Sequence, residues 1–348
     1  MDLSKLYKKL PSKIQESDEL LILLMKISKT IRKTNSKSTP NYALNSMFKH
    51  NNVKITGSLR HIQQMYLELL RFIDNICGKY DLDYCLIYGT LIGAMRHEGF
   101  IPWDDDCDIL MMRKDYEKLI EVLPQELKKN EFLKENCALT KLINKEENYF
   151  KDMNSIYNKK LGHDDYFNQP HLGKSIFLQI GWLKPMVKLD IFPYDYVKEN
   201  KIDYYNKSYS AYKFSFRSSL FEKNNFKFNE EFNRIFSKMG LTLNKTDYIG
   251  EGIDASEIDD FGWFPTEYIF PLKTIQFENY EFKCPNKPDK LLKLWYGDDY
   301  MDIPSNITMH GYQEYNSTLF NSQTEMEMSF KNTIKKLKEI NDEIEQNI

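Results

Sequence analysis

One stretch of the sequence, Tyr84 to Met112, constrains the fold more than any other. Its first five residues form an apolar run that is typical of a buried strand, and this run stops at Gly89-Thr90, where a small residue lets backbone N–H groups face a ligand. We expect a short helix next, capped by Thr90 and ended by Gly99. Four aspartates then lead directly into a second apolar run, Ile109 to Met112. This junction predicts a functional site.

The four aspartates of this stretch are Asp104, Asp105, Asp106 and Asp108. Residues two apart on a strand share a face, so Asp106 and Asp108 are expected to point the same way, with Asp104 in line if the strand starts early. Two unit charges about 4 Å apart repel by roughly 4 kcal/mol at an effective dielectric near 20, so such a pair needs a proton or a cation. Carboxylate oxygens suit Mg²⁺ or Mn²⁺. A solvated acidic turn is the alternative for the aspartates alone, but the strand and the Gly-Thr turn beside them favour a metal site.

A further apolar run, Val187 to Val197, contains the acid Asp190 between Leu189 and Ile191. A carboxylate with such neighbours is rarely left without a partner. The residues alone leave two roles open: Asp190 caps a local turn, or it joins the first acids as a third carboxylate of the metal site.

Composition excludes several classes of protein. The net charge of −3, from 48 basic and 51 acidic residues, lacks the basic character of nucleic-acid binders, so no nucleic acid partner is expected. The five cysteines are scattered, as in the reduced core of a cytosolic protein, and the six histidines lack the spacing of zinc ligands. The N-terminus is not of signal-peptide type and no run of 18 apolar residues occurs, so we expect neither secretion nor a membrane span.

Helices are expected along much of the chain. Their apolar spacing places them at 17–33, 58–80, 114–127, 204–220, 230–239, 288–296 and from 325 onward. We predict an N-terminal helical extension at 1–57, a central domain at 58–310 with an insert at about 128–174, and a C-terminal helix within 311–348. The last helix has the spacing of a packed or a self-associating helix.

Three segments together resemble the LicD family of phosphocholine transferases, a group that includes fukutin-related ribitol-phosphate transferases. They are GTLIGAMRHEGFIPWDDDCDILMMRKDYEKL, KLDIFPYD and LLKLWYGDDYMDIP, and the similarity runs in order from about Asp83 to His310. The resemblance implies an α/β (α+β) fold, a nucleotidyltransferase-like mixed sheet flanked by helices, with additional helical segments at both termini.

The resemblance also implies roles for individual residues. Gly89 and Thr90 match the family's glycine turn near the nucleotide phosphates, and Asp106 and Asp108 match its metal pair. Asp190 lies where the family has its third carboxylate. The residue before Gly89 departs from the pattern, because many members have a second glycine where this chain has a tyrosine.

The implied reaction is transfer of a phospho-alcohol, typically phosphocholine from CDP-choline, to a hydroxyl of a glycan with release of CMP. It would require Mg²⁺ or Mn²⁺, since phosphoryl-type transfer needs charge neutralisation on the donor phosphates. Lipopolysaccharide, teichoic acid and capsule are the glycans we consider.

Further candidates surround these acids in the sequence. Arg96, His97 and Asp104 lie between the glycine turn and the metal pair, where Arg96 and His97 could hold phosphate, and His310 is a more distant candidate. A quaternary ammonium favours an aromatic cage. The candidates for such a cage are Trp103, Trp182, Trp263, Trp295 and Tyr296.

Two other functions stay open. A metal-dependent glycosyltransferase also uses Asp-x-Asp, but usually after a nucleotide-binding domain of roughly a hundred residues, whereas a Gly-Thr turn precedes it closely here. A non-catalytic glycan-binding module is disfavoured because all three acids are present. We expect a cytoplasmic protein, with peripheral association at the inner face of the membrane and oligomerisation through the C-terminal helix as further options.

Overall fold

The structure, a computed structural model, describes residues 56–140, 178–183, 185–205, 209, 228–255, 262–303 and 319–347. The expected helix at 17–33, most of the expected insert, most of the expected helix at 204–220, and His310 lie outside these residues.

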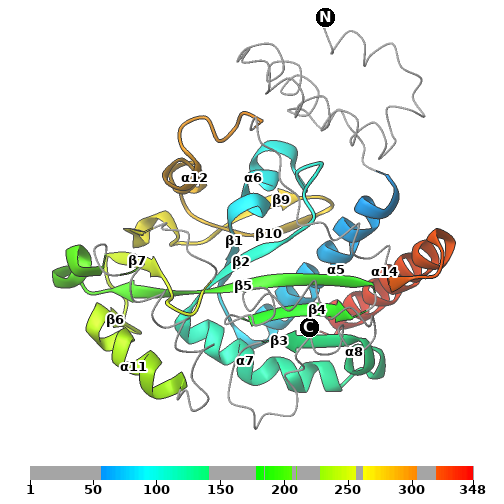
Figure 1. Cartoon of the computed structure of the whole chain (residues 1–348), viewed down its shortest axis with the longest axis horizontal. Helices are drawn as coiled ribbons and strands as arrows, with labels where there is room; N and C mark the ends of the chain where they lie inside the picture. Colours follow the sequence, from blue (N-terminus) through cyan, green and yellow to red (C-terminus); the bar gives the residue numbers. More distant parts are fainter. Residues whose placement is uncertain are drawn as a thin grey trace, which may run out of the picture.

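A mixed sheet occupies the centre of the molecule (Figure 1). Its main path runs in the order β1 (Tyr84–Leu86), β2 (Asp108–Met112), β5 (Met186–Val197), β4 (Leu178–Leu183) and β3 (Cys137–Thr140). β2 and β5 are parallel, and the other neighbours on this path are antiparallel. Three short strands extend the sheet alongside the C-terminal part of β5. β6 (Leu241–Thr242) and β7 (Tyr248–Glu251) pair with β5, and β8 (Trp263–Pro265) pairs with β7. The expected mixed α/β class is confirmed.

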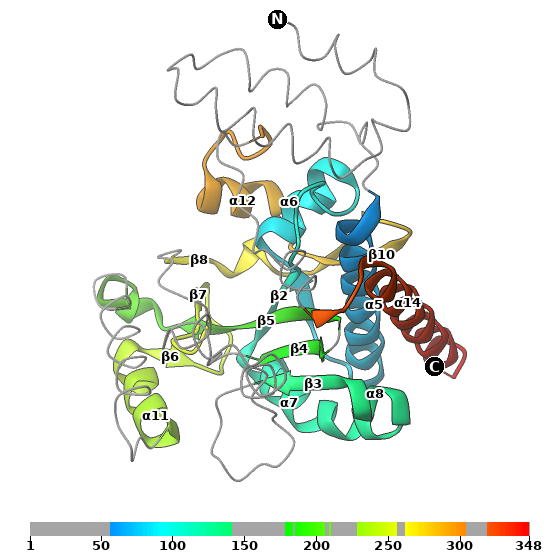
Figure 2. The ribbon, with the colours of Figure 1, turned by 45° about the vertical axis from the view of Figure 1, so that its right-hand side comes forward.

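Helices surround this sheet, as Figures 1 and 2 show from two directions. They are α5 (Gly57–Tyr80), α6 (Tyr88–His97), α7 (Arg113–Lys128), α8 (Glu131–Asn136), α11 (Phe228–Met239), α12 (Pro288–Tyr296) and α14 (Gln323–Glu345). Because both faces are covered, β2 is buried along its whole length, which explains why its sequence is continuously apolar after Asp108 rather than alternating. The predicted helices at 58–80, 114–127, 230–239 and 288–296 are confirmed; α8 and β3 were not predicted within the insert.

A separate hairpin, β9 (Lys273–Phe277) and β10 (Tyr280–Cys284), packs beside β1 and α6. Its tip, Glu278, has a positive φ of 57° and lies against the segment that follows α6.

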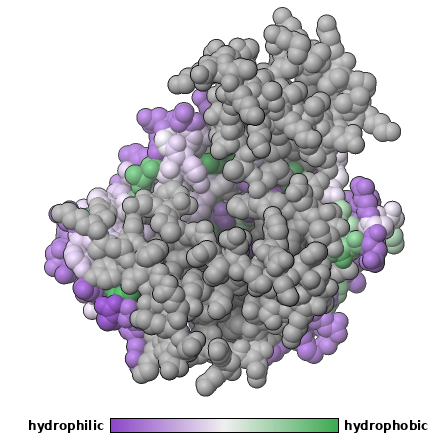
Figure 3. All heavy atoms as spheres, viewed as in Figure 1, coloured by the Kyte–Doolittle hydropathy of each residue, from purple (hydrophilic) through white to green (hydrophobic). Residues whose placement is uncertain are grey.

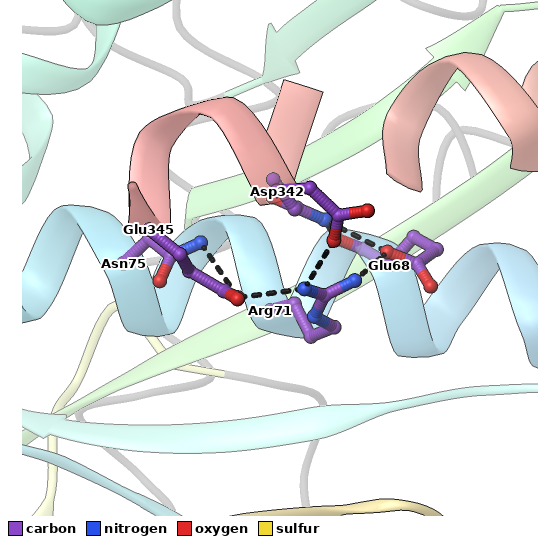
Figure 4. A network of polar contacts seen from close by, with 6 residues as sticks. Glu68, Arg71, Asn75, Asp342 and Glu345 are labelled. Atoms are coloured by element: carbon purple, nitrogen blue, oxygen red, sulfur yellow. Dashed lines mark hydrogen bonds and ion pairs between the residues drawn. The ribbon is translucent and has the colours of Figure 1, made fainter. Parts of the chain in front are cut away.

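The C-terminal helix α14 packs along α5. Met326, Phe330 and Leu337 are buried in this contact. Figure 4 shows the polar part of the same contact, where the Arg71 guanidinium donates to Glu68 on its own helix and to Asp342 and Glu345 on α14. Of the two expected alternatives, the packed helix is the one observed. Self-association through this helix stays a prediction.

The five cysteines are all free and buried, as expected. Among the described residues, no helix combines the length and the apolar character that a membrane crossing requires. On the face shown in Figure 3, the coloured surface is mostly hydrophilic, with small separate hydrophobic patches.

Candidate functional site

The glycine turn is tied directly to the first acid of β2. Helix α6 begins at Tyr88 with Ile87 as its N-cap, so the expectation that Thr90 caps this helix is wrong. Thr90 lies within the first turn instead, and its Oγ1 accepts the backbone N–H of Asp108 at 2.9 Å. The residue fixes where β2 starts.

Tyr88 explains the departure from the family's glycine pattern. Its φ is 48°, in the left-handed region that favours glycine. The side chain is buried, and its hydroxyl lies 2.6 Å from the Tyr194 hydroxyl and donates to Glu251 Oε1 at 3.2 Å. These hydrogen bonds hold a tyrosine in a backbone conformation that costs a non-glycine residue about 1 kcal/mol or more.

Asp104 and Asp106 precede β2, which begins only at Asp108. The strand therefore does not start early, yet the carboxylates still act on one another. Burial raises the pKa of Asp108 well above its usual range, and the charges of Asp106, Asp190 and Asp104 raise it further. The pKa of Asp104 is also raised, by burial and then by the charge of Asp106 and a side-chain hydrogen bond between the two.

Asp190 lies beside Asp108 on the neighbouring parallel strand. The two residues are paired in register, and the Asp190 N–H donates to the carbonyl of Cys107 at 3.0 Å. Because β5 runs without interruption through Asp190, the turn-capping alternative is wrong. The structure places the third acid beside Asp108, and its metal-binding role stays a prediction.

Gly89 lies against Asp104. A Cβ added at Gly89 would stand 2.9 Å from Asp104 Oδ2, so a side chain at this position would displace the carboxylate. The small residue thus lets the turn lie close to Asp104, and the role of its backbone N–H groups toward a ligand stays a prediction.

Arg96 is buried and bound by protein groups. Its Nη1 donates to the carbonyls of Tyr300 and Asp302 at 3.2 and 3.0 Å, its Nε donates to His97 Nε2 at 2.9 Å, and its guanidinium lies 5.9 Å from the Trp103 ring. Burial lowers the pKa of Arg96 to about 10, so the group remains charged at neutral pH. These contacts tie α6 to the segment after α12; phosphate binding by Arg96 and His97 stays a prediction.

The aromatic candidates lie in several places within the described part of the chain. Trp103 contacts His97, Trp182 contacts Phe132, Trp263 contacts Tyr248, and Trp295 contacts Tyr88 and Phe264. Tyr296 is exposed at the end of α12. Of these candidates, Trp295 contacts the residue before the glycine turn: its ring lies 4.9 Å from the Tyr88 ring between centroids.

The donor chemistry of the acids suits a divalent metal ion. In the residues that the structure describes, no three His, Cys, Asp or Glu side chains converge closely enough to hold a metal by themselves. Burial and neighbouring carboxylates raise the pKa of Asp104 and Asp108, so a proton or a cation would be stabilised among these acids. The assignment of Asp106, Asp108 and Asp190 as metal ligands stays a prediction.

Sequence reasoning missed the residues that support the acids from behind. Gln63 of α5 is 2% exposed and hydrogen-bonds the main chain before Asp106. Its signal was present in the sequence, since it is a polar residue on the apolar side of a helix that carries Ile62 and Tyr66.

Residues 81–198 match the family model described as LicD/FKTN/FKRP, nucleotidyltransferase domain. The chain is 31% identical over 277 residues to the lipopolysaccharide cholinephosphotransferase LicD of Haemophilus influenzae. This alignment covers 71% of this chain and 92% of that protein. The chain belongs to the LicD family. Over 58 residues it is also 41% and 40% identical to uncharacterized proteins of Rickettsia prowazekii and Rickettsia typhi, covering 17% of this chain and 22% and 19% of theirs. The predictions that the chain is a LicD family member and an enzyme are confirmed.

Proposed function

We propose that this LicD family enzyme transfers phosphocholine, or a related phospho-alcohol, from a CDP-activated donor to a hydroxyl of a cell-surface glycan or its precursor. CMP leaves, and the reaction depends on a divalent metal ion. The observation that carries the proposal is the arrangement of Asp106, Asp108 and Asp190 beside the Gly89-Thr90 turn, in a chain of this family.

The chain's own groups have distinct tasks in this proposal. Phosphoryl-type transfer needs charge neutralisation on the donor phosphates and a hydroxyl in line with the leaving group. Mg²⁺ or Mn²⁺, when bound, supplies that neutralisation. Asp106, Asp108 and Asp190 would hold the ion, and the turn at Gly89 would present backbone N–H groups to the phosphates. Asp190 would also accept the proton of the attacking hydroxyl.

The similarity to the Haemophilus influenzae protein supports phosphocholine as the group transferred and lipopolysaccharide as the class of acceptor. Teichoic acid and capsule remain alternative acceptors. A desolvated trimethylammonium gains up to about 2 kcal/mol from an aromatic face, and a polyol gains none of it. Trp295, held against Tyr88, is the aromatic residue we would test first for this contact.

The test is to incubate the protein with Mg²⁺ and CDP-choline, CDP-ethanolamine, CDP-ribitol or CDP-glycerol, and to measure CMP release with and without a glycan acceptor. We expect CDP-choline to react fastest. Equal rates with CDP-choline and CDP-ribitol would overturn the choline assignment and leave the transferase assignment intact. Turnover of a UDP-sugar, with no CMP from any CDP-alcohol, would instead favour the glycosyltransferase.

A further inference from the structure

The acids are carried by a loop that other parts of the chain hold in place. We call residues 98–107, between α6 and β2, the acid loop. The Gln63 side chain donates from Nε2 to two carbonyls of this loop, Ile101 at 3.2 Å and Asp104 at 3.1 Å. The Asp104 N–H in turn donates to the Ile101 carbonyl at 2.9 Å. One buried amide therefore closes the turn that leads into the acids.

Arg60 sets the orientation of that amide. Its Nη1 donates to Gln63 Oε1 at 3.3 Å, so the NH₂ group of Gln63 faces the acid loop. The same guanidinium donates to both carboxylate oxygens of Glu278, at 2.9 and 2.7 Å. Such a two-pronged contact fixes geometry as well as charge.

Glu278 holds the other end of the acid loop from the tip of the β9–β10 hairpin. Its N–H donates to the Glu98 carbonyl at 2.6 Å, and its Oε1 accepts the Phe100 N–H at 3.5 Å. The fit is close, because a Cβ at Gly99 would stand 2.8 Å from Glu278 Oε1. The Phe100 ring also meets Phe277 at 4.8 Å between centroids. Two elements outside the matched residues 81–198 thus fix this loop.

We propose that Gln63 is a positioning residue for the candidate metal site, with Arg60 and Glu278 orienting it. It fixes the main chain at Asp104 and so sets where the carboxylates of Asp104 and Asp106 stand relative to Asp108 on β2. The metal-binding part of this inference rests on the proposed function, whereas the placement of the loop does not. Removing the amide would leave the Asp104 carbonyl without this donor and the Ile101 carbonyl with only the Asp104 N–H, and the loop would move to find water.

The test uses the full chain and two matched variants. Gln63→Met keeps the length of the side chain and removes its amide. Asn341→Leu is the control, because Asn341 is also a buried amide that donates to a carbonyl of α5, that of Glu68 at 2.9 Å, but on the side facing α14. Arg60→Met is a second probe: its side chain is 28% exposed, so the variant is expected to fold.

Two readouts separate positioning from stability. By hydrogen exchange without metal, Gln63→Met should speed exchange of the acid-loop amides by about tenfold or more, while Asn341→Leu changes only amides near α14. In CMP release, Gln63→Met should raise the Mg²⁺ concentration for half-maximal rate by about tenfold, with the rate at saturating Mg²⁺ within about threefold of wild type. Arg60→Met should change both readouts in the same direction as Gln63→Met, but by a smaller factor.

Unchanged exchange in the acid loop of Gln63→Met would overturn the inference, as would equal loop exchange in Gln63→Met and Asn341→Leu. An unchanged Mg²⁺ requirement together with faster loop exchange would overturn its metal-site part. If the wild type releases no CMP from any CDP-alcohol, the proposed function fails, and the exchange result still decides whether Gln63 positions the loop.

Discussion

Two groups of carboxylates lie at opposite ends of the same pair of strands, β2 and β5. At one end, Asp108 and Asp190 stand side by side. At the other end, five residues farther along β5, Asp195 and Asp254 share the guanidinium of Arg113, which contacts them at 2.8 and 2.7 Å. Asp108 and Asp195 are buried, with 8% and 0% exposure, whereas Asp190 is half-buried.

The difference between the two ends is the source of the positive charge. Arg113 makes two hydrogen bonds to each of its carboxylates, so the charge there is compensated within the protein. At the other end, the neighbouring charges that shift the pKa of Asp108 most are carboxylates, while Arg96 partly offsets the raised pKa of Asp104. A cation taken from solution would compensate the negative charge at this end. A metal-binding site needs such a cation from outside, whereas a structural ion pair already contains its own.

The largest effect is expected from Asp190→Asn. Because the change keeps the shape of the side chain and removes its basicity, we expect transfer to fall by roughly a hundred- to ten-thousandfold. Binding of metal and CDP-donor, measured by calorimetry, should stay within about tenfold of wild type. An unfolded variant would make Asp190 a structural acid like Asp195. Normal transfer would place the base elsewhere, with Asp104 or His97 next to be tested.

At the compensated end, Arg113→Met should destabilise the fold by about 3–5 kcal/mol, because it leaves two carboxylates buried without their counter-charge. Urea unfolding at neutral pH measures this. Arg234→Met is the control, since Arg234 pairs with Glu231 on an exposed face of α11 and its loss should cost less than about 1 kcal/mol. Equal, small losses in the two variants would mean that the Arg113 cluster is not a structural ion pair.

At the uncompensated end, Asp106→Asn and Asp108→Asn should each lower turnover by about a hundredfold or more at saturating Mg²⁺. The variants should fold, and their thermal stability without metal should hold or rise, because each removes one of several like charges. CMP release and thermal unfolding are the two measurements. Near-normal turnover in either variant would remove that residue from the metal site.

The sequence indicated that Asp108 and Asp190 belong together, which the structure shows, but it did not indicate the Arg113 cluster. Asp106, Asp108 and Asp190 stood out because acids beside apolar strands are unusual, and a family resemblance joined them. Arg113 gave no such signal, since one arginine after a strand resembles any helix start. Its partners follow it by 82 and 141 residues, and only the fold brings them together.

Local geometry explains the remaining differences. From its residue type, Thr90 was expected to cap a helix, but the helix begins two residues earlier, at Tyr88. No local sequence rule predicts the positive φ of Tyr88 or the burial of its hydroxyl. Gln63 and Glu278 were missed for a related reason: each acts on the acid loop from a distant element. Periodicity identifies helices and strands, whereas these contacts depend on how the elements pack.

The smallest effect we predict is a difference in how stability depends on pH. Burial and neighbouring carboxylates raise the pKa of Asp108 in the folded protein above its value of about 3.9 in the unfolded chain. From that pH up to the folded pKa, the folded state therefore binds more protons than the unfolded state, and the free energy of unfolding falls as pH rises. Asp108→Asn removes this contribution, so its stability relative to wild type should increase with pH above about 4 and then level off.

Urea unfolding of both proteins between pH 5 and 8, without metal, measures this difference. Asp289→Asn is a control whose stability relative to wild type should stay constant over this range, because hydrogen bonds from Lys293 and Tyr300 lower the pKa of the exposed Asp289 carboxyl and its contribution is lost only as pH falls below about 4. Adding Mg²⁺ at the upper pH should stabilise the wild type more than Asp108→Asn, since the ion binds the folded state through this carboxylate. If the stability of Asp108→Asn relative to wild type were the same at every pH, the charge of Asp108 would already be compensated inside the protein. The two ends of the strand pair would then not differ in their need for an added cation.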